Sequence, residues 1–341
     1  MQLYSCICSI RPHLERIVVL IDRFGRQIHY LRLSVTDRCD LRCSYCMPEG
    51  FKDFEAPANW LSFDEIERVV AAFARLGLQR IRLTGGEPLL RKDLPVLAAR
   101  LSQLPGITDL SLSTNGTLLA RHAQALRAAG VSRLNVSLDT LDPERFVAIT
   151  RRHALDRVLL GLAAAQEAGF APIKINMVMT EGIQDAEIDA MVAFCMERQF
   201  VLRLIEVMPV GDTGRRTVAV SLGPVQQRLR EKFGLVGGIV SGGGPARYLV
   251  SSDGRCRIGF ITPISQHFCE TCNRVRLSVD GTLYLCLGKN DRVDVRAVLR
   301  GGCSDQELHQ LLLDAIQQKP WRHEFSDRPE QIVRFMSSTG G

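Results

Sequence analysis

Three cysteines in one short segment constrain this chain more than any other feature of its sequence. Cys39, Cys43 and Cys46 have the spacing C-x3-C-x2-C. Residues 30–35 just before them alternate between apolar and polar side chains, so we expect a strand that ends where the cysteine loop begins. Three thiolates in so short a loop can bind one small inorganic core. A [4Fe–4S] cluster contains four irons, so three protein ligands leave one iron open to another molecule.

Other interpretations of this cysteine group are weaker. A structural zinc site normally needs a fourth protein ligand nearby, and residues 47–96 contain neither cysteine nor histidine. A group of core cysteines is disfavoured because Asp40, Arg42 and Ser44 make the segment too polar for a buried strand. The spacing therefore favours an iron–sulfur site over zinc, a disulfide or core packing.

The overall cysteine content points in the same direction. Eleven cysteines in 341 residues do not suggest a disulfide scaffold, and six of them fall in two tight groups. Without an export signal, such grouping predicts metal ligation in a reducing compartment, so we expect a cytoplasmic protein. The apolar run at residues 17–21 is far too short to cross a bilayer, and no membrane partner is expected.

The charge balance gives only a mild indication of the partner. The formal charge is +6, from 43 basic and 37 acidic residues. This excess is too small and too dispersed to predict nucleic-acid binding. It fits an anionic small molecule as well as a solvated, arginine-rich surface.

Strand and helix patterns alternate along most of the chain. A capping box at Ser62 and Glu65 begins one amphipathic helix, and Asp142-Pro143 begins another. Strands are predicted near residues 30–35, 80–83, 108–113, 132–138, 172–179 and 201–207. Helices are predicted near residues 62–76, 93–104, 121–129, 155–168 and 185–198. Strands separated by helices indicate right-handed βαβ units in a parallel sheet. We therefore expect an α/β fold with an open, partial (βα)6 barrel, whose ligands bind at the C-terminal ends of the strands.

Glycines become frequent near residues 209–250, which predicts loops and a domain boundary. We expect a flexible N-terminal extension over residues 1–21, a core over 22–245, and a smaller C-terminal domain over 246–341. Within that domain, short strands and turns are predicted over 256–288, and a helix near 304–318.

A glycine-rich turn follows the second predicted strand. Its sequence, Thr84-Gly85-Gly86-Glu87-Pro88, has two glycines that let the backbone approach a ligand and a carboxylate beside exposed amides. Such a turn is common alone, but together with the cysteine loop it resembles the radical S-adenosylmethionine (SAM) superfamily. The resemblance implies that the open iron chelates SAM. It also implies that the reduced cluster cleaves SAM into methionine and a 5′-deoxyadenosyl radical.

A second cysteine group lies in the C-terminal part of the chain. Cys269, Cys272 and Cys286 again provide three thiols without an obvious fourth ligand. Zinc is a stronger alternative here, because C-x2-C turns are common zinc knuckles, and His267 or Cys256 could complete the site. The residues alone therefore leave zinc open at this second group.

Two arginines follow this second group. Arg274 and Arg276 alternate on a predicted strand and would face an anion together. Guanidinium groups suit phosphate because they donate paired, parallel hydrogen bonds. A solvated arginine face would not explain why the pair begins beside the cysteines.

The whole pattern resembles one family, the GTP 3′,8-cyclases of molybdenum cofactor biosynthesis. It combines the radical SAM core, a C-x2-C-x13-C group and a terminal Gly-Gly, from about Asp22 to Gly341. The resemblance implies a second [4Fe–4S] cluster whose open iron binds guanine. It further implies that the 5′-deoxyadenosyl radical removes the 3′ hydrogen of GTP and that the C3′ radical adds to C8. The product is (8S)-3′,8-cyclo-7,8-dihydroguanosine 5′-triphosphate, and its formation is the first step of molybdopterin biosynthesis.

The same resemblance assigns roles to individual residues. The ligands of the two [4Fe–4S] clusters are Cys39, Cys43 and Cys46, and Cys269, Cys272 and Cys286. The SAM contacts are Tyr45, Gly86, Ser137 and Met208. The GTP contacts are Arg32, Arg82, Ser113, Lys174, Arg274, Val275 and Arg276. Several of the GTP contacts are cationic, which suits a triphosphate. From the residues alone, Tyr45 and Met208 could be packing residues and Lys174 a solvated lysine.

The terminal Gly340 and Gly341 are placed in the active site by the resemblance. Only glycine threads a crowded pocket without Cβ clashes, and residues 337–339 suit a mobile strand that enters the site; a frayed end is the alternative. The expected partners are GTP, a reducing electron donor and the cyclic pyranopterin monophosphate synthase that acts next. No nucleic acid is expected, and a homodimer is one assembly to test.

Two other functions fit parts of the pattern. A peptide-modifying radical SAM enzyme with an auxiliary cluster is one, although such enzymes usually have more C-terminal cysteines. A zinc-stabilised RNA-binding protein is the other, and it would need aromatic stacking residues among its arginines. The region around 269–286 has only Phe268 and Tyr284.

Overall fold

The computed structural model describes residues 19–240 and 242–340. Most of the predicted extension over 1–21 therefore lies outside the described residues. From residue 19 onward, Ile21 forms an isolated bridge with Gln27, and the chain turns at Gly25 before the first strand.

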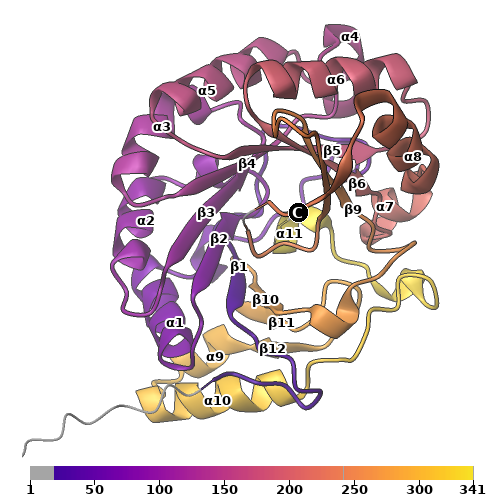
Figure 1. The fold of residues 1–341 in the computed structure, drawn as a ribbon. Coiled ribbons are helices and arrows are strands. Elements are labelled where there is room, and N and C mark those ends of the chain that lie inside the picture. The colour runs from indigo at the N-terminus through magenta and orange to yellow at the C-terminus, as the bar shows by residue number, and fades with distance from the viewer. Residues whose placement is uncertain (1–18, 241, 341) are drawn as a thin grey trace, which may run out of the picture.

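Six parallel strands form the centre of the molecule, in the order β1-β2-β3-β4-β5-β6. Outer helices connect them and form a ring around the sheet (Figure 1). The strands are β1 (Tyr30–Ser34), β2 (Arg80–Thr84), β3 (Asp109–Thr114), β4 (Arg133–Ser137), β5 (Ile173–Met179) and β6 (Val201–Glu206). The helices are α1 (Phe63–Arg75), α2 (Leu94–Ser102), α3 (Leu119–Ala128), α4 (Pro143–Thr150), α5 (Leu155–Glu167) and α6 (Asp185–Glu197). The predicted partial barrel is confirmed.

Local sequence explains where these helices begin. The Ser62 side chain accepts from the Glu65 amide and the Glu65 side chain accepts from the Ser62 amide, so the predicted capping box is present. Asp142 caps α4 by accepting from the amide of Arg145, with Pro143 at the first helical position. The inner faces of the helices and the face of the sheet that they cover are aliphatic, and they form one continuous core. Alternate strand residues on the other face include Arg32, Lys174 and Arg203, which are buried and polar.

The C-terminal strands extend both edges of the same sheet. β9 (Arg257–Ile261) pairs in parallel with β6, and β10 (Arg274–Leu277) pairs in parallel with β1. The antiparallel strands β7 (Val236–Gly238) and β8 (Arg247–Val250) continue one edge, and β11 (Thr282–Tyr284) and β12 (Arg292–Asp294) continue the other. The division between residues 245 and 246 stays a prediction, and its boundary falls inside the β7–β8 hairpin.

Loops were predicted over much of 209–250, and this was wrong for two segments. Helix α7 spans Gly211–Arg216, and α8 spans Leu222–Phe233. α8 buries Leu222, Val225 and Leu229, a helical spacing that the nearby glycines obscured. No helix in the described ranges combines the length and apolar character needed to cross a membrane.

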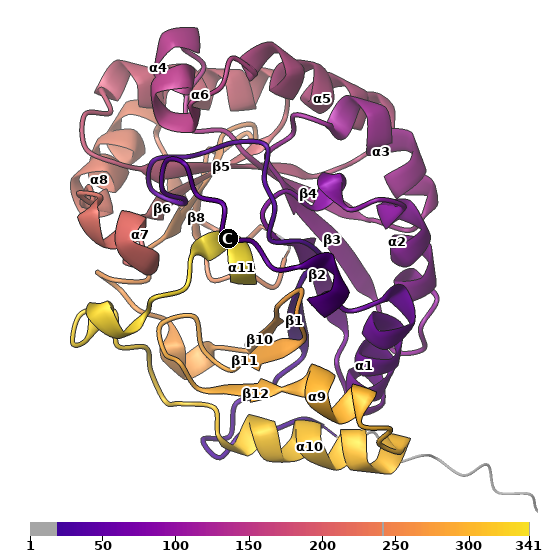
Figure 2. The same ribbon diagram turned by 180° about the vertical axis from the view of Figure 1, so that it is seen from behind.

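The last part of the chain returns to the centre of the ring. α9 (Val295–Arg300) and α10 (Asp305–Gln317) pack outside it, with α10 against α1. The chain then turns inward, and α11 (Met336–Thr339) lies within the ring of strands in both views (Figures 1 and 2). The mobile strand expected at 337–339 is therefore a short helix, with Ser337 and Thr339 buried.

Candidate active site

The first cysteine loop is held against the glycine-rich turn by backbone hydrogen bonds. The amide of Gly86 donates to the carbonyl of Thr36 at 2.9 Å, and the amide of Glu87 donates to that of Arg38 at 2.8 Å. A Cβ on Gly85, where φ is +145°, would collide with the Thr36 carbonyl. The glycine is thus required by the approach of two protein loops, which places the cysteines beside the C-terminal ends of β1 and β2.

Glu87 faces the protein interior rather than a ligand. Its carboxylate accepts from the Leu89 amide (3.0 Å), the Thr114 hydroxyl (2.7 Å) and the Asn115 amide (2.6 Å). Burial raises the pKa of Glu87 to about 7, against these hydrogen bonds, which lower it. The carboxylate therefore joins the turn after β2 to the end of β3, which corrects the expectation that it is offered to a ligand.

Cys39, Cys43 and Cys46 line one cavity together. Burial raises the pKa of all three thiols, to about 11 for Cys46, and the neighbouring thiolates raise those of Cys39 and Cys43 further. Three buried thiolates need positive charge beside them to persist. An iron core supplies that charge, so the residues fit a [4Fe–4S] cluster.

The four predicted SAM contacts, Tyr45, Gly86, Ser137 and Met208, line this same first cavity. The Tyr45 hydroxyl donates to Asp139 at 2.7 Å. Ser113, which was predicted to contact GTP, also lines the first cavity, and its buried hydroxyl has no partner within the described chain. Its assignment to GTP stays a prediction.

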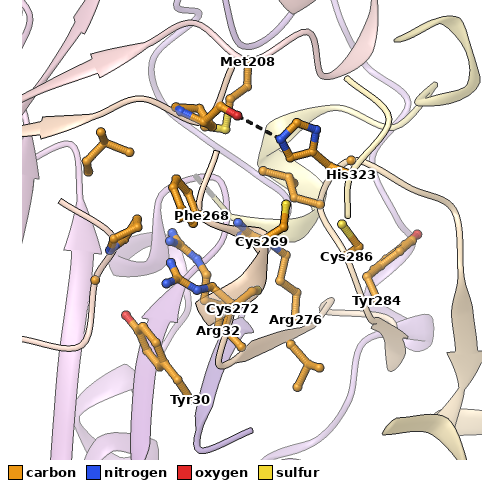
Figure 3. Close-up of a pocket in the computed structure, with 18 of the residues that line it drawn as sticks. Tyr30, Arg32, Met208, Phe268, Cys269, Cys272, Arg276, Tyr284, Cys286 and His323 are labelled. Carbon is orange, nitrogen blue, oxygen red and sulfur yellow. Dashed lines mark hydrogen bonds between the residues drawn. The ribbon is translucent and has the colours of Figure 1, made fainter. Parts of the chain in front are cut away.

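The second cysteine group lines a second cavity, together with the predicted contacts Arg32, Arg82, Arg274, Val275 and Arg276. Figure 3 shows Cys269, Cys272 and Cys286 around the same open space as Arg32, Arg276 and Tyr30. Neither His267 nor Cys256, the two candidates for a fourth zinc ligand, lines it.

Sheet register explains why the arginines meet. Arg32 of β1 lies opposite Arg276 of β10 on one side and opposite Arg82 of β2 on the other. Burial, reinforced by the charges of Arg276 and Arg82, lowers the pKa of Arg32 well below its usual value. The pKa of Arg276 falls to about 9 through burial and the charges of Arg274 and Arg334. A row of buried guanidinium groups is costly unless an anion binds there.

Among the buried polar atoms without a partner inside the described chain, six belong to residues of the second cavity. They are Tyr30 Oη, Arg32 Nε and Nη2, Asn176 Oδ1, Arg203 Nε and Arg274 Nε. All of these residues line the second cavity. Buried polar atoms are normally hydrogen-bonded, so the group indicates a polar ligand.

A cationic hollow adjoins the second cavity. We define it by Arg82, Arg133, Lys174 and Arg203, which line it beneath residues 242–244. Burial, with the charges of Arg203, Arg133 and Arg82, lowers the pKa of Lys174 to about 7. Arg203 was missed in the sequence, where it reads as one polar residue within an apolar strand. Only the structure shows that it is a buried cation, at 3% exposure in the middle of β6.

The first and second cavities meet at shared wall residues, which are Asn176, Ile205, Met208 and Met336. The tail lies at this junction. Arg276 Nη1 donates to the Gly340 carbonyl at 2.7 Å, and Ser337 lines the first cavity together with Cys46. Gly340 has φ +74°, and a Cβ there would collide with Thr84. Gly341 lies outside the described residues.

The cysteine groups do not form a site for a single metal ion. In the described residues, no three His, Cys, Asp or Glu side chains are arranged to hold one metal ion. A [4Fe–4S] cluster places each cysteine on a different iron, so its ligands need not converge on one ion.

Comparison with known proteins identifies the family. The model of the radical SAM superfamily matches residues 33–195, and that of the Molybdenum Cofactor Synthesis C domain matches residues 200–325. A GTP 3′,8-cyclase from Ectopseudomonas mendocina is 47% identical over 327 residues, which cover 94% of this chain and 98% of the relative. The chain belongs to the GTP 3′,8-cyclase family. GTP 3′,8-cyclase 1 from Pseudomonas aeruginosa is 48% identical over 94% of this chain and 99% of its own length.

Solved structures agree with the fold of this cyclase family member. SuiB from Streptococcus suis bound to S-adenosylmethionine has a TM-score of 0.63 at 17% identity, covering 87% of this chain and 68% of that chain. SuiB bound to its precursor peptide SuiA has a TM-score of 0.59, also at 17% identity. At this identity the similarity supports the radical SAM fold and no more.

Proposed function

We propose that this chain converts GTP into (8S)-3′,8-cyclo-7,8-dihydroguanosine 5′-triphosphate, the first step of molybdopterin biosynthesis. The observation that carries the proposal is the joining of two cysteine-lined cavities beside a cationic hollow. One cavity fits SAM and its cluster, and the other, with the hollow, fits a polar anion. The chain is 47–48% identical, over 94% of its length, to proteins named GTP 3′,8-cyclase, and this similarity supports the choice of substrate.

The first cavity is the proposed radical-generating half. The radical SAM family implies a [4Fe–4S] cluster here, which when bound supplies the electron that cleaves SAM. Tyr45, Gly86, Ser137 and Met208 are proposed to hold SAM. The hydrogen bond to Asp139 fixes the hydroxyl of Tyr45, which lies between Cys43 and Cys46 in the sequence.

The second cavity is the proposed substrate half, with a second [4Fe–4S] cluster on Cys269, Cys272 and Cys286. The triphosphate would lie toward the cationic hollow, because Lys174 and Arg203 gather there. The guanine would then lie toward the second cysteine group, and the ribose near Asn176, where the two cavities meet. In this order the ribose, which carries the 3′ hydrogen, would lie nearest to the first cavity.

The remaining partners are part of the proposal. Reduction of the clusters needs an electron donor, and the product would pass to cyclic pyranopterin monophosphate synthase. A cytoplasmic location suits clusters that require reduced thiols. A homodimer remains to be tested.

The decisive experiment is anaerobic incubation of reconstituted protein with a reductant, SAM and GTP. We expect 5′-deoxyadenosine and a cyclised nucleotide, both absent when Cys43 is replaced by alanine. Formation of 5′-deoxyadenosine by Cys43→Ala would show that the radical site is misplaced. Iron near eight per chain is expected, and zinc in place of iron would favour the RNA-binding alternative. Turnover of a peptide but not of GTP would favour the peptide-modifying one.

A further inference from the structure

Lys319 is a buried cation whose role the proposed reaction does not explain. It follows α10 and is 1% exposed. Its ammonium group donates to the carbonyl of Arg274 at 3.0 Å and to the carbonyl of Leu285. Both acceptors are neutral, and within residues 19–240 and 242–340 no carboxylate lies within ion-pair distance of it. A buried positive charge with only neutral partners destabilises the protein unless a negatively charged group lies near it.

The two acceptor carbonyls lie next to ligands of the second cysteine group. Arg274 is two residues after Cys272, and Leu285 directly precedes Cys286. Lys319 lines the second cavity together with Cys272 and Cys286. The lysine thus joins β10 to the end of β11 beside two of the three cysteines.

The third ligand is tied to the same segment through Arg26. Its Nη1 donates to the Cys269 carbonyl at 2.9 Å, while its Nη2 donates to the carbonyl of Pro320, the residue after Lys319, at 2.7 Å. Arg26 differs from Lys319 in one respect, because Asp22 forms an ion pair with it at 2.6 Å. The charge of Arg26 is therefore compensated by the protein.

Two other cations near the second cysteine group could share their charge with the proposed substrate. Arg274 and Arg276 lie on β10, close behind Cys272 in the sequence. Both arginines line the second cavity, where the proposed substrate would share their charge. Lys319 also lines this cavity, but its ammonium group already donates to two backbone carbonyls beside the cysteines, which hold its charge at that place.

We propose that Lys319 is a positioning residue whose fixed positive charge compensates the second iron–sulfur cluster and raises its reduction potential. This inference rests on the second cluster of the proposed function. A thiolate-bound [4Fe–4S] cluster is negatively charged, and reduction adds one further electron. A positive charge at a fixed place in a buried site therefore stabilises the reduced state more than the oxidised one.

The test compares variants at Lys319 by anaerobic redox titration of the reconstituted protein. Lys319→Gln keeps amide hydrogens for the two carbonyls but removes the charge, and Lys319→Arg keeps the charge. The double variant Asp22→Asn/Arg26→Gln is the matched control, because it removes a buried ion pair beside the third ligand without changing the net charge. Spectra recorded with dithionite, with and without SAM, assign the first cluster's signal, which serves as an internal reference.

We expect Lys319→Gln to shift the second cluster to a more negative potential while the first cluster stays unchanged. Lys319→Arg and the double variant should stay near the parent value. Loss of the second cluster in Lys319→Gln but not in Lys319→Arg, with iron falling from about eight to about four per chain, would also support the charge. A parent-like potential in Lys319→Gln with intact iron overturns the inference, as does loss of the cluster in both variants, which indicates packing alone.

Failure of the proposed function would look different. If the parent protein binds only about four irons per chain, the second cluster is absent and the inference about Lys319 fails. Parent protein with both clusters but no cyclised GTP contradicts the proposed reaction, and the potentials of the variants still decide the role of Lys319.

Discussion

Lys174 lies among cations that oppose its own charge. Burial and the charges of Arg203, Arg133 and Arg82 lower its pKa from 10.5 to about 7. Without a ligand this arrangement does not stabilise the protein, because the neighbouring cations disfavour the charged form of Lys174. A polyphosphate reverses the balance, since its negative charge stabilises the ammonium group.

This reasoning predicts a pH dependence for GTP binding. Above pH 7, Lys174 is increasingly neutral in the protein without GTP, so binding must take up a proton and the affinity should fall as pH rises. Below pH 7 the lysine is already charged and its contribution should level off. Calorimetry in buffers of different ionisation enthalpy should detect the proton uptake at about pH 8. Lys174→Arg, which stays charged, should remove this uptake, and unchanged uptake in that variant would contradict the assignment.

Arg274 gives a second prediction at the scale of single residues. Its Nε is buried without a partner in the described chain, and its guanidinium group lies over the rings of Tyr30 and Phe268. Arg274→Ala should weaken GTP binding by about 1.5–3 kcal/mol, the usual contribution of a charge-assisted hydrogen bond. Both clusters should persist. Arg198→Ala removes an exposed ion pair after α6 and should leave the affinity for GTP unchanged. Equal losses of affinity in the two variants would show that Arg274 acts only through the net charge of the protein and not through a contact with GTP.

The loops after β1 and β2 behave as one element. The backbone of Gly85 and Gly86 packs directly on that of residues 36–38, and the same segment leads into Cys39. Gly85→Ala should force these loops apart, because the new Cβ meets a backbone carbonyl at a positive φ. We expect loss of the first cluster and of SAM cleavage, measured by iron content and 5′-deoxyadenosine. Gly223→Ala in α8, where the nearest atom to a new Cβ is 3.8 Å away, is the control and should keep both; a full first cluster in Gly85→Ala would contradict the interlocking of the loops.

The same elements show what the sequence could predict. The six parallel strands and their helices follow from local periodicity, because each buries an apolar face against its neighbours. α8 was missed because glycines near it indicated loops. Arg203 and Lys319 could not be recognised, since their importance depends on contacts between segments distant in the sequence. The pairing of β10 with β1, which aligns Arg32 with Arg276, is non-local for the same reason.

At the scale of the whole molecule, one sheet brings the two cysteine groups together. β1 leads into the first group, and β10, its neighbour, begins two residues after Cys272. The C-terminal segment is fixed to the barrel on the outside as well, where Arg68 and Arg75 of α1 form ion pairs with Asp305 of α10. Exposed pairs of this kind add little stability, so strand pairing and core packing carry most of this attachment.

The position of the chain end leads to the last prediction. Gly340 lies between Thr84 and Arg276, at the junction of the two cavities, and its carbonyl accepts from Arg276 at 2.7 Å. Deletion of Gly340 and Gly341 removes this acceptor but no ligand of either cysteine group. Folding, both clusters and SAM binding should therefore remain. Cyclisation of GTP should fall sharply because Arg276 loses its shorter hydrogen bond to the tail and keeps only the Thr339 carbonyl, at 3.5 Å in the parent.

The measurement is the ratio of cyclised nucleotide to 5′-deoxyadenosine under anaerobic conditions. Gly340→Ala is the companion variant, since its Cβ would collide with Thr84 and displace the tail without shortening it. Both variants should lower the ratio while SAM cleavage continues. A deletion protein that forms the cyclised product at the parent rate would mean that Gly340 and Gly341 have no part in the catalytic step, and that Arg276 does not need the Gly340 carbonyl to be oriented.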